Sequence, residues 1–330
     1  MSIRIGITCG DVNGIGPEIS LKAVSSKDWK NVEFTFIGPE QIFDVSNVWK
    51  KQEHPTQLVS NAWKETSPDA VRWNVGLNEA PSIGKIRAEA SMTAVAAIER
   101  AVQGCLAGEL DAMVTAPICK EGLQLANIPW PGHTEMIAAM TGCKRYGMML
   151  MGKGLRVMLA TRHLPLRDVA DALTHDNILE AIELTGEALE QLGLENRRIG
   201  VCGLNPHAGD GGALGSEEAD IIAPAIDDAR AKGLNVTGPV PADTIFFQCL
   251  ETYDAIVAMY HDQGLGPLKM HAFDCGVNWT VGLPIIRTSP DHGTAFNIAG
   301  KDQARPDSMI AAIKTAIALA KRARNTGIME

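Results

Sequence analysis

The sequence lacks the features that mark several common classes of protein. It has no run of about 18 apolar residues, which a transmembrane helix needs, and residues 1–8 do not show the charged, apolar and small-residue order of a signal peptide. Its seven cysteines form no C-x-x-C pair, and their odd number does not fit a complete disulfide framework. We therefore expect a cytoplasmic protein with reduced thiols and no membrane segment.

Positive charge is also scarce in this sequence. Its formal net charge of −9 argues against nucleic acid or an anionic membrane as a partner, because both require a basic surface. An anionic ligand would instead need a local cluster of positive side chains. The 45% of hydrophobic residues is ordinary for a folded chain, and 330 residues are enough for two domains or one large α/β unit.

Short apolar, β-rich runs alternate with helical patterns along the chain. A strand is predicted over 3–8 and a helix from Pro17, and the alternation continues to a last helix over 308–324. This order is typical of crossover units around a mainly parallel sheet, so the predicted class is α/β. The polar stretch 49–81 is less regular, and we interpret it as an excursion from the sheet.

Three of the eight histidines share one setting, because each follows the end of a predicted parallel strand: His163, His207 and His261. The carboxyl ends of parallel strands form the edge where α/β sheets build their sites. Three neutral imidazoles at that edge would hold a divalent metal and leave a position for substrate. The alternative is that they are three independent turn or core histidines.

Polar and cationic side chains follow the third of these histidines. Lys269, Asn278 and Arg287 lie in glycine-containing or extended sequence. A lysine point charge and an arginine fork suit a phosphate or carboxylate, although lysine and arginine are most often solvated surface charges. Upstream, His133 and Thr134 lie in a turn before a helical run, where Thr134 is a candidate helix cap and the first amides a candidate anion site.

Two segments near the ends of the chain, Gly10–Glu18 and Asp291–Lys301, resemble the paired signatures of the isocitrate and isopropylmalate dehydrogenase fold. The glycine spacing of the first segment is not that of a Rossmann fingerprint. In that superfamily the second segment holds the adenosine part of NAD, so the resemblance implies these cofactor-binding residues: His292, Gly293, Thr294 and Ala295.

The same resemblance implies two α/β/α domains with the active site in the cleft between them. Residues 1–128 and 284–330 would form a first domain that carries the NAD loop. Residues 129–283 would form a second domain that carries the metal ligands and the dimer contacts.

Within this superfamily the whole chain resembles the 4-hydroxythreonine-4-phosphate dehydrogenase family. The matching stretches are Thr115-Ala-Pro, Pro131-Gly-His-Thr-Glu, Thr161-Arg-His-Leu-Pro-Leu-Arg-Asp, Gly203-Leu-Asn-Pro-His-Ala-Gly, Pro241-Ala-Asp-Thr, Met259-Tyr-His-Asp-Gln-Gly, Gly276-Val-Asn and Arg287-Thr-Ser-x-Asp-His-Gly-Thr-Ala. The resemblance implies that His163, His207 and His261 are metal ligands drawn from both chains of a homodimer. It also implies this set of substrate-binding residues: His133, Thr134, Lys269, Asn278 and Arg287.

The reaction implied is the oxidation of 4-phosphooxy-L-threonine at C3 by NAD or NADP, with one divalent ion (Zn, Mg or Co) in each active site. The product, 2-amino-3-oxo-4-phosphooxybutanoate, loses carbon dioxide to give 3-amino-2-oxopropyl phosphate, on the route to pyridoxal phosphate. As the general base we expect Asp243 or a metal-bound water, with Lys269 as a substrate clamp that could also serve.

Some positions depart from the family pattern and leave more than one function open. Cys119 stands where Asn is expected before Lys120, and the NAD loop ends in 304–306 as Ala-Arg-Pro, so the choice between NAD and NADP stays open. Close relatives oxidise 4-phospho-D-threonate or 4-phospho-D-erythronate, and another branch oxidises aromatic cis-dihydrodiols. A metal-dependent hydrolase and a non-catalytic binding protein would also use such residue types. The Asp291–Ala295 loop argues against a hydrolase, which has no use for a nucleotide site.

Overall fold

The computed structural model describes residues 2–39, 42, 71–76, 80–247 and 249–326. The chain divides into two compact units, which we call unit 1 (Met1–Lys144 with Leu283–Arg324) and unit 2 (built on Arg145–Gly282). The first boundary predicted from the sequence, 128/129, lies ahead of the observed one. The reason is that helix α7 (His133–Met140) packs against helix α5 (Ala88–Leu106) and so belongs to unit 1.

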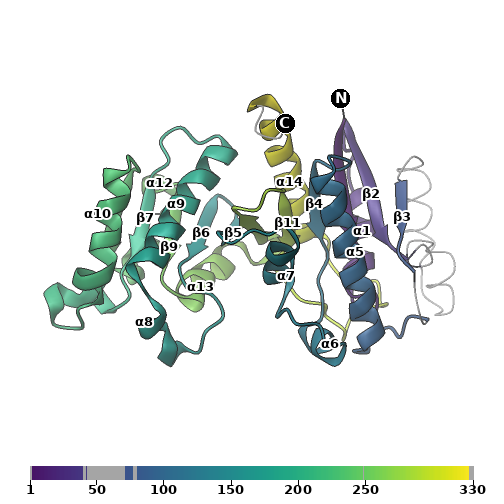
Figure 1. Ribbon diagram of the computed structural model, residues 1–330, viewed down its shortest axis with the longest axis horizontal. Helices are drawn as coiled ribbons and strands as arrows, with labels where there is room; N and C mark the ends of the chain where they lie inside the picture. Colours follow the sequence, from purple (N-terminus) through teal and green to yellow (C-terminus); the bar gives the residue numbers. More distant parts are fainter. Residues whose placement is uncertain (1, 40–41, 43–70, 77–79, 248, 327–330) are drawn as a thin grey trace. The chain divides into compact units, whose positions relative to one another are not determined.

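Unit 1 contains a parallel sheet in the strand order β3-β2-β1-β4-β11, with most of its strands labelled in Figure 1. The strands are β1 (Ile3–Thr8), β2 (Val32–Gly38), β3 (Val71–Asn74), β4 (Ala112–Thr115) and β11 (Arg287–Pro290). Strand β3 falls inside the stretch that we interpreted as an excursion from the sheet, so that interpretation is wrong for these four residues. The rest of the stretch lies almost wholly outside the described residues.

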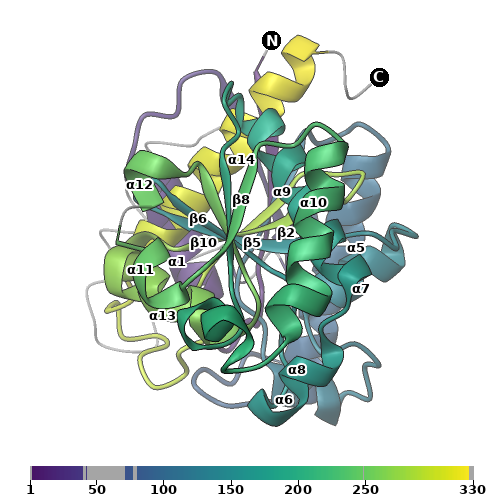
Figure 2. The same ribbon diagram turned by 90° about the vertical axis from the view of Figure 1, so that its left-hand side faces the viewer.

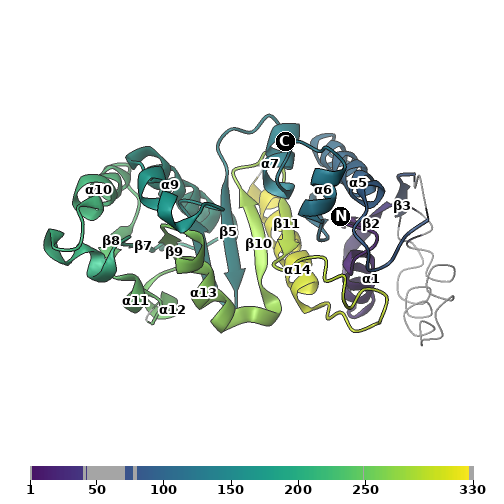
Figure 3. The same cartoon turned by 90° about the horizontal axis from the view of Figure 1, so that it is seen from below.

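Helices cover both faces of the unit 1 sheet. Helices α1 (Gly16–Ser25) and α14 (Asp307–Thr326) lie on one face, while α5, α6 (Lys120–Leu125) and α7 lie on the other (Figures 2 and 3). Helix α5 buries an alanine-rich stripe at helical spacing, which lets its backbone approach the strands closely. The stripe consists of Ala90, Ala94, Ala97, Ile98 and Ala101.

Unit 2 contains strands in the order β10-β5-β6-β9-β7-β8. They are β5 (Gly147–Gly152), β6 (Leu155–Leu159), β7 (Ile199–Cys202), β8 (Val236–Val240), β9 (Ala255–Ala258) and β10 (Val277–Val281). Strand β5 is antiparallel to both β10 and β6, whereas β6, β9, β7 and β8 are parallel. The predicted α/β class is confirmed in both units.

The unit 2 strands also lie between two helical layers. Figures 2 and 3 show α9 (His175–Leu192) and α10 (Ala223–Ala231) on one face, with α11 (Ala242–Ile245), α12 (Cys249–Thr252) and α13 (His261–Ala272) on the other. Helix α9 has clear end signals, since Thr174 and Asn177 form a capping box and Gly193 ends it in the left-handed conformation. The shorter elements are η1 (Leu166–Asp168), α8 (Val169–Ala172), η2 (Pro206–Gly212), η3 (Glu218–Ile222) and η4 (Phe273–Cys275).

Each unit has an apolar interior formed by its strands and helices. In unit 2 the cluster includes Leu150, Val157, Ile256 and Leu268, which come from three neighbouring strands and helix α13. Burial of such side chains stabilises the unit by about 25 cal/mol per Å² of apolar surface. Among the described helices, none is both long and apolar enough to cross a membrane.

Candidate active site

Two of the predicted metal ligands lie side by side in unit 2. His163 follows strand β6 and His261 follows strand β9, and these strands are paired in parallel. Their rings are 5.3 Å apart between centroids and tilted by 41°. The Nδ1 atom of His261 lies 2.7 Å from Oδ1 of Asp262, and when Nδ1–H donates there, Nε2 is the acceptor atom of the ring. The strand-end position of these histidines therefore brings two imidazoles together.

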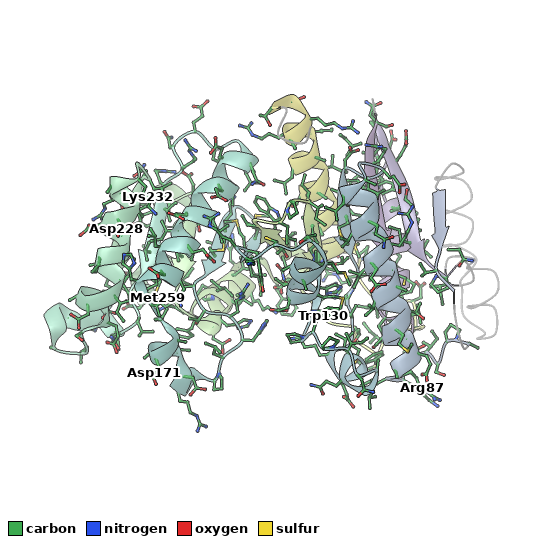
Figure 4. The ribbon with its side chains drawn as sticks, in the orientation of Figure 1. Arg87, Trp130, Asp171, Asp228, Lys232 and Met259 are labelled. Atoms are coloured by element: carbon green, nitrogen blue, oxygen red, sulfur yellow. The ribbon has the colours of Figure 1, made fainter. Side chains whose placement is uncertain are left out.

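A set of buried hydrogen bonds at Met259 fixes the ends of the three strands that precede the histidines. The backbone N–H and the hydroxyl of Thr161, after β6, both donate to the Met259 carbonyl, at 3.1 and 2.7 Å. The Gln263 amide accepts from the Met259 N–H at 2.7 Å and donates to the Gly203 carbonyl, after β7, at 2.8 Å. Figure 4 labels Met259 in this part of unit 2. Neither Thr161 nor Gln263 was singled out from the sequence, although both lie in the matched stretches.

The third histidine lies in an unusual turn. His207, with φ of 54°, begins six successive residues with positive φ, which end at Gly212 with φ of 97°. Non-glycine residues rarely adopt this conformation. The buried Glu218 carboxylate holds the start of the turn, because its Oε1 accepts from the N–H groups of Leu204 and Asn205 at 2.8 and 2.7 Å. Within the described part of this single chain, no three His, Cys, Asp or Glu side chains are grouped to hold a metal ion.

The remaining predicted residues of unit 2 lie on different elements. Asp243 is in the first turn of α11, which follows β8, and Lys269 is in the last turn of α13; both are exposed. Asn278 lies on β10, and its side-chain Oδ1 is buried with no hydrogen-bond partner among the described residues. A buried carbonyl oxygen without a donor is costly, so Asn278 has a vacant acceptor.

In unit 1 the predicted Arg287 is the first residue of β11 and only 1% exposed. Its Nε–H and Nη2–H groups both donate to the Thr115 hydroxyl oxygen, at 3.1 and 2.8 Å. Burial lowers the pKa of the guanidinium to about 10, and the nearby Glu135 carboxylate opposes this shift. The side chain therefore stays positive at neutral pH, as a desolvated cation that would attract an anion strongly.

His133 and Thr134 open helix α7 near this arginine. Burial, and then the charge of Arg287, lower the pKa of His133 well below 6.5, while a hydrogen bond to the Ala116 backbone opposes the shift. The Nε2 atom is buried and has no partner among the described residues, so the neutral ring offers it as an acceptor. The prediction that Thr134 caps the helix is wrong: the helix begins at His133, which makes Gly132 the N-cap and places Thr134 inside the first turn.

The two signature segments of unit 1 contact each other. The Ile15 N–H donates to the carbonyl of Thr294 at 3.0 Å, and a Cβ placed on Gly14 would lie 2.8 Å from the same oxygen. Gly14 therefore serves a close backbone approach, whereas Gly10 serves a turn with φ of 64°. The neighbouring His292, Gly293 and Ala295 belong to the same loop. The sequence did not reveal this contact, because it joins residues about 280 positions apart.

The fold and these strand-end side chains place the chain among α/β proteins whose polar residues gather at the carboxyl ends of parallel strands. Residues 30–316 match the family described as pyridoxal phosphate biosynthetic protein PdxA. The chain is 40% identical over 330 residues to the 4-hydroxythreonine-4-phosphate dehydrogenase of Burkholderia vietnamiensis, covering 98% of each chain. This protein therefore belongs to the PdxA family.

Two other comparisons agree with this assignment. The crystal structure of 4-hydroxythreonine-4-phosphate dehydrogenase from Klebsiella pneumoniae superimposes with a TM-score of 0.83 at 39% identity, covering 97% of this chain and 98% of that one. The D-threonate 4-phosphate dehydrogenase of Salmonella typhimurium is 41% identical over 324 residues, covering 96% of this chain and 98% of its own. These relatives are named as dehydrogenases, which argues against a hydrolase.

Proposed function

We propose that this protein oxidises 4-phosphooxy-L-threonine at C3 with NAD or NADP, in the pathway to pyridoxal phosphate. The observation that carries the proposal is the match over 98% of the chain to a curated 4-hydroxythreonine-4-phosphate dehydrogenase. The product, 2-amino-3-oxo-4-phosphooxybutanoate, is a β-keto acid that loses carbon dioxide to give 3-amino-2-oxopropyl phosphate. Buried and polar groups in both units supply functions that this reaction needs.

In the proposal, unit 1 provides residues that bind and orient the substrate. The buried Arg287 guanidinium binds a phosphate or carboxylate, and the first amides of α7 at His133 and Thr134 add further donors. The neutral His133 ring has a vacant acceptor at Nε2, which suits a substrate hydroxyl or ammonium group. Lys269 and Asn278 are the substrate-binding residues proposed for unit 2.

His163, His207 and His261 are the proposed metal ligands. The adjacent imidazoles of His163 and His261 fit part of a divalent site in their donor chemistry and spacing. A bound Zn, Mg or Co ion would act as a Lewis acid that lowers the proton affinity of the hydroxyl to be oxidised. The chain's own contribution is to hold the two rings at paired strand ends.

The remaining steps are assigned to polar groups and to the cofactor loop. A bound NAD or NADP would accept hydride from C3. For the base that takes the hydroxyl proton we propose Asp243, with Lys269 as an alternative. Both side chains are exposed on their helices. The proposed adenosine site is the loop of His292, Gly293, Thr294 and Ala295. A hydrogen bond from the Ile15 N–H to the Thr294 carbonyl holds this loop against the turn that precedes helix α1.

We also propose a homodimer in which the second chain completes each site. The described chain does not assemble a group of three metal-binding side chains, and His207 lies in a turn of its own. Large apolar side chains are exposed on the α11–α13 side of unit 2, namely Phe247 (89%), Met270 (92%) and Phe273 (77%). Exposed apolar side chains of this size favour burial against another protein surface.

A second substrate is favoured by one specific observation. The Salmonella typhimurium relative, named for D-threonate 4-phosphate, is about as similar to this chain as the relatives named for 4-hydroxythreonine-4-phosphate. The alternative is therefore 4-phospho-D-threonate, or the related 4-phospho-D-erythronate, which carry a hydroxyl where 4-phosphooxy-L-threonine carries an amino group. The Nε2 atom of His133 would accept a hydrogen bond from either group, so it does not discriminate.

The test is to incubate the protein with NAD or NADP and a divalent metal, and to follow reduced nicotinamide with each of the three phosphorylated acids. The proposal predicts the highest kcat/KM with 4-phosphooxy-L-threonine. A higher value with a phosphorylated sugar acid would favour the alternative. Absence of reduction with all three acids and both cofactors would reject the whole assignment.

A further inference from the structure

Thr115 makes a contact with Arg287 that links two strands of unit 1. Thr115 is the last residue of β4 and 0% exposed, and its hydroxyl oxygen accepts from both Nε and Nη2 of Arg287. Two donors on one edge of a planar guanidinium therefore converge on a single oxygen. Such a contact restricts rotation of the guanidinium about its long side chain, which is otherwise flexible.

The backbone gives the Thr115 hydroxyl a fixed position. In the sheet, Thr115 pairs with Thr8 of β1, and the preceding residue Val114 pairs with Thr288 of β11, next to Arg287. A strand bordered on both sides has little freedom at its end, and the side chain of Thr115 is β-branched. The hydroxyl is thus a rigid reference point beside a buried cation.

We propose that Thr115 is a positioning residue, which orients the Arg287 guanidinium toward the anionic group of the substrate. This inference rests on the proposed function, in which Arg287 binds the phosphate or carboxylate. A bidentate contact between arginine and an anion requires the planes of both groups to be aligned. Thr115 holds the guanidinium in that alignment before substrate binds. The arginine side chain therefore loses less conformational entropy on binding.

The first test uses Thr115→Val, which keeps the shape of the side chain and removes the hydroxyl. We expect KM for the phosphorylated substrate to rise about tenfold, since a charge-assisted hydrogen bond is lost, while kcat stays within about twofold because the anion lies away from the reacting carbon. Thr115→Ser retains the hydroxyl and should keep KM near the wild-type value. An unchanged KM in Thr115→Val, or a rise of the same size in Thr115→Ser, would overturn the inference.

Thr288→Val is the matched control. Thr288 is also 0% exposed, is adjacent to Arg287, and donates its hydroxyl to the Ala312 carbonyl of α14 at 2.9 Å. Removing this hydroxyl tests the loss of a buried hydrogen bond without changing the guanidinium contact. Its KM should stay near wild type, and a rise equal to that of Thr115→Val would show that the effect is merely structural.

A double-mutant comparison tests whether Thr115 acts through Arg287. In an Arg287→Ala background, Thr115→Val should raise KM by less than about twofold further, because the group that it positions is gone. Equal effects in the two backgrounds would contradict the inference. If Thr115→Val fails to fold, Thr115→Ala replaces it in both tests with the same expected outcomes.

One further measurement separates this inference from the proposed function. In nitrogen-15 NMR spectra the Arg287 Nε–H, assigned by its absence in Arg287→Lys, should exchange slowly with water in the wild type and in Thr288→Val. It should exchange at least about tenfold faster in Thr115→Val, because a hydrogen bond and its protection are lost. A wild type that oxidises none of the candidate substrates rejects the proposed function alone. Unchanged Nε–H exchange in Thr115→Val rejects the positioning role.

Discussion

The two units build their candidate binding residues in different ways. In unit 1 the Arg287 side chain is 1% exposed and held by Thr115, whereas in unit 2 the side chain of His261 is 34% exposed. The charged group of unit 1 is therefore already oriented within one chain. The histidines of unit 2 follow fixed strand ends, but within the described chain they do not form a group of three metal-binding side chains.

The largest effect is expected on metal affinity, at the metal ligands proposed in unit 2. Replacing His163 or His261 by Ala should lower divalent-metal affinity at least about 100-fold, because a ligand of a small set is lost. Metal content after dialysis against a metal buffer measures this directly. His175→Ala is the matched control, since His175 is also partly exposed but contacts Asp176 and Asp228 instead of another histidine. Figure 4 labels Asp228, which belongs to α10. Full metal content in both variants would contradict the ligand assignment.

The second effect tests the orientation of the cation in unit 1. Arg287→Lys keeps the charge but removes the planar fork, so kcat/KM should fall about 10- to 100-fold. Arg145→Lys is the control, because Arg145 makes a partly exposed ion pair with Glu187 at 2.8 Å. Wild-type kcat/KM in Arg287→Lys would show that the anion binds elsewhere, and the first turn of α7 would then be the better candidate.

A smaller effect tests whether the strand ends of unit 2 are fixed by buried hydrogen bonds. Gln263→Leu leaves the Met259 N–H and the Gly203 carbonyl without their side-chain partner, which should destabilise the protein by about 2 kcal/mol. The loss of thermal stability measures this, with Gln103→Leu on the exposed side of α5 as a control that should change little. Equal melting temperatures for the two variants would show that the Met259 contacts are replaceable.

The smallest effect is a pH dependence in unit 1. The folded-state pKa of His133 lies well below its unfolded value, so the unfolded chain binds the proton first as pH falls. Stability from this residue is therefore present at neutral pH and is lost as pH falls below about 6.5, by about 1 kcal/mol between pH 7 and about pH 5.7. His133→Gln cannot titrate and should lose less stability over this range. Parallel losses in wild type and variant would show that His133 does not carry the dependence.

The fold could be read from the sequence wherever local pattern decides the structure. The strand predicted over 3–8 coincides with β1, and the helix predicted from Pro17 begins one residue earlier, at Gly16. The antiparallel direction of β5 was not predicted, because apolar patterns indicate burial without indicating strand direction. Strand β3 was missed because Val71–Asn74 lies within a polar, irregular stretch.

The sequence predicted which residues are candidates for the site, but not which of them contact each other. The strand-end setting of His163 and His261 was visible in the sequence, yet their contact depends on β6 and β9 being neighbours across about 100 residues. The contact between Thr115 and Arg287 joins residues 172 positions apart, and no local signal marks it. The helix boundary at His133 was misplaced by the assumption that the hydroxyl residue, and not Gly132, would occupy the cap.

The central claim is that unit 1 carries its oriented cation within one chain, whereas the histidine site of unit 2 needs a second chain. The most direct test mixes two inactive variants, His207→Ala and His261→Ala, after exchange of subunits. If the partner supplies His207, one site in each mixed dimer has both histidines intact, and an equal mixture should recover about a quarter of wild-type activity. Mixing His163→Ala with His261→Ala should recover none, because those rings lie together in one chain. No recovery in the first mixture, with subunit exchange demonstrated by mass spectrometry, would contradict the claim.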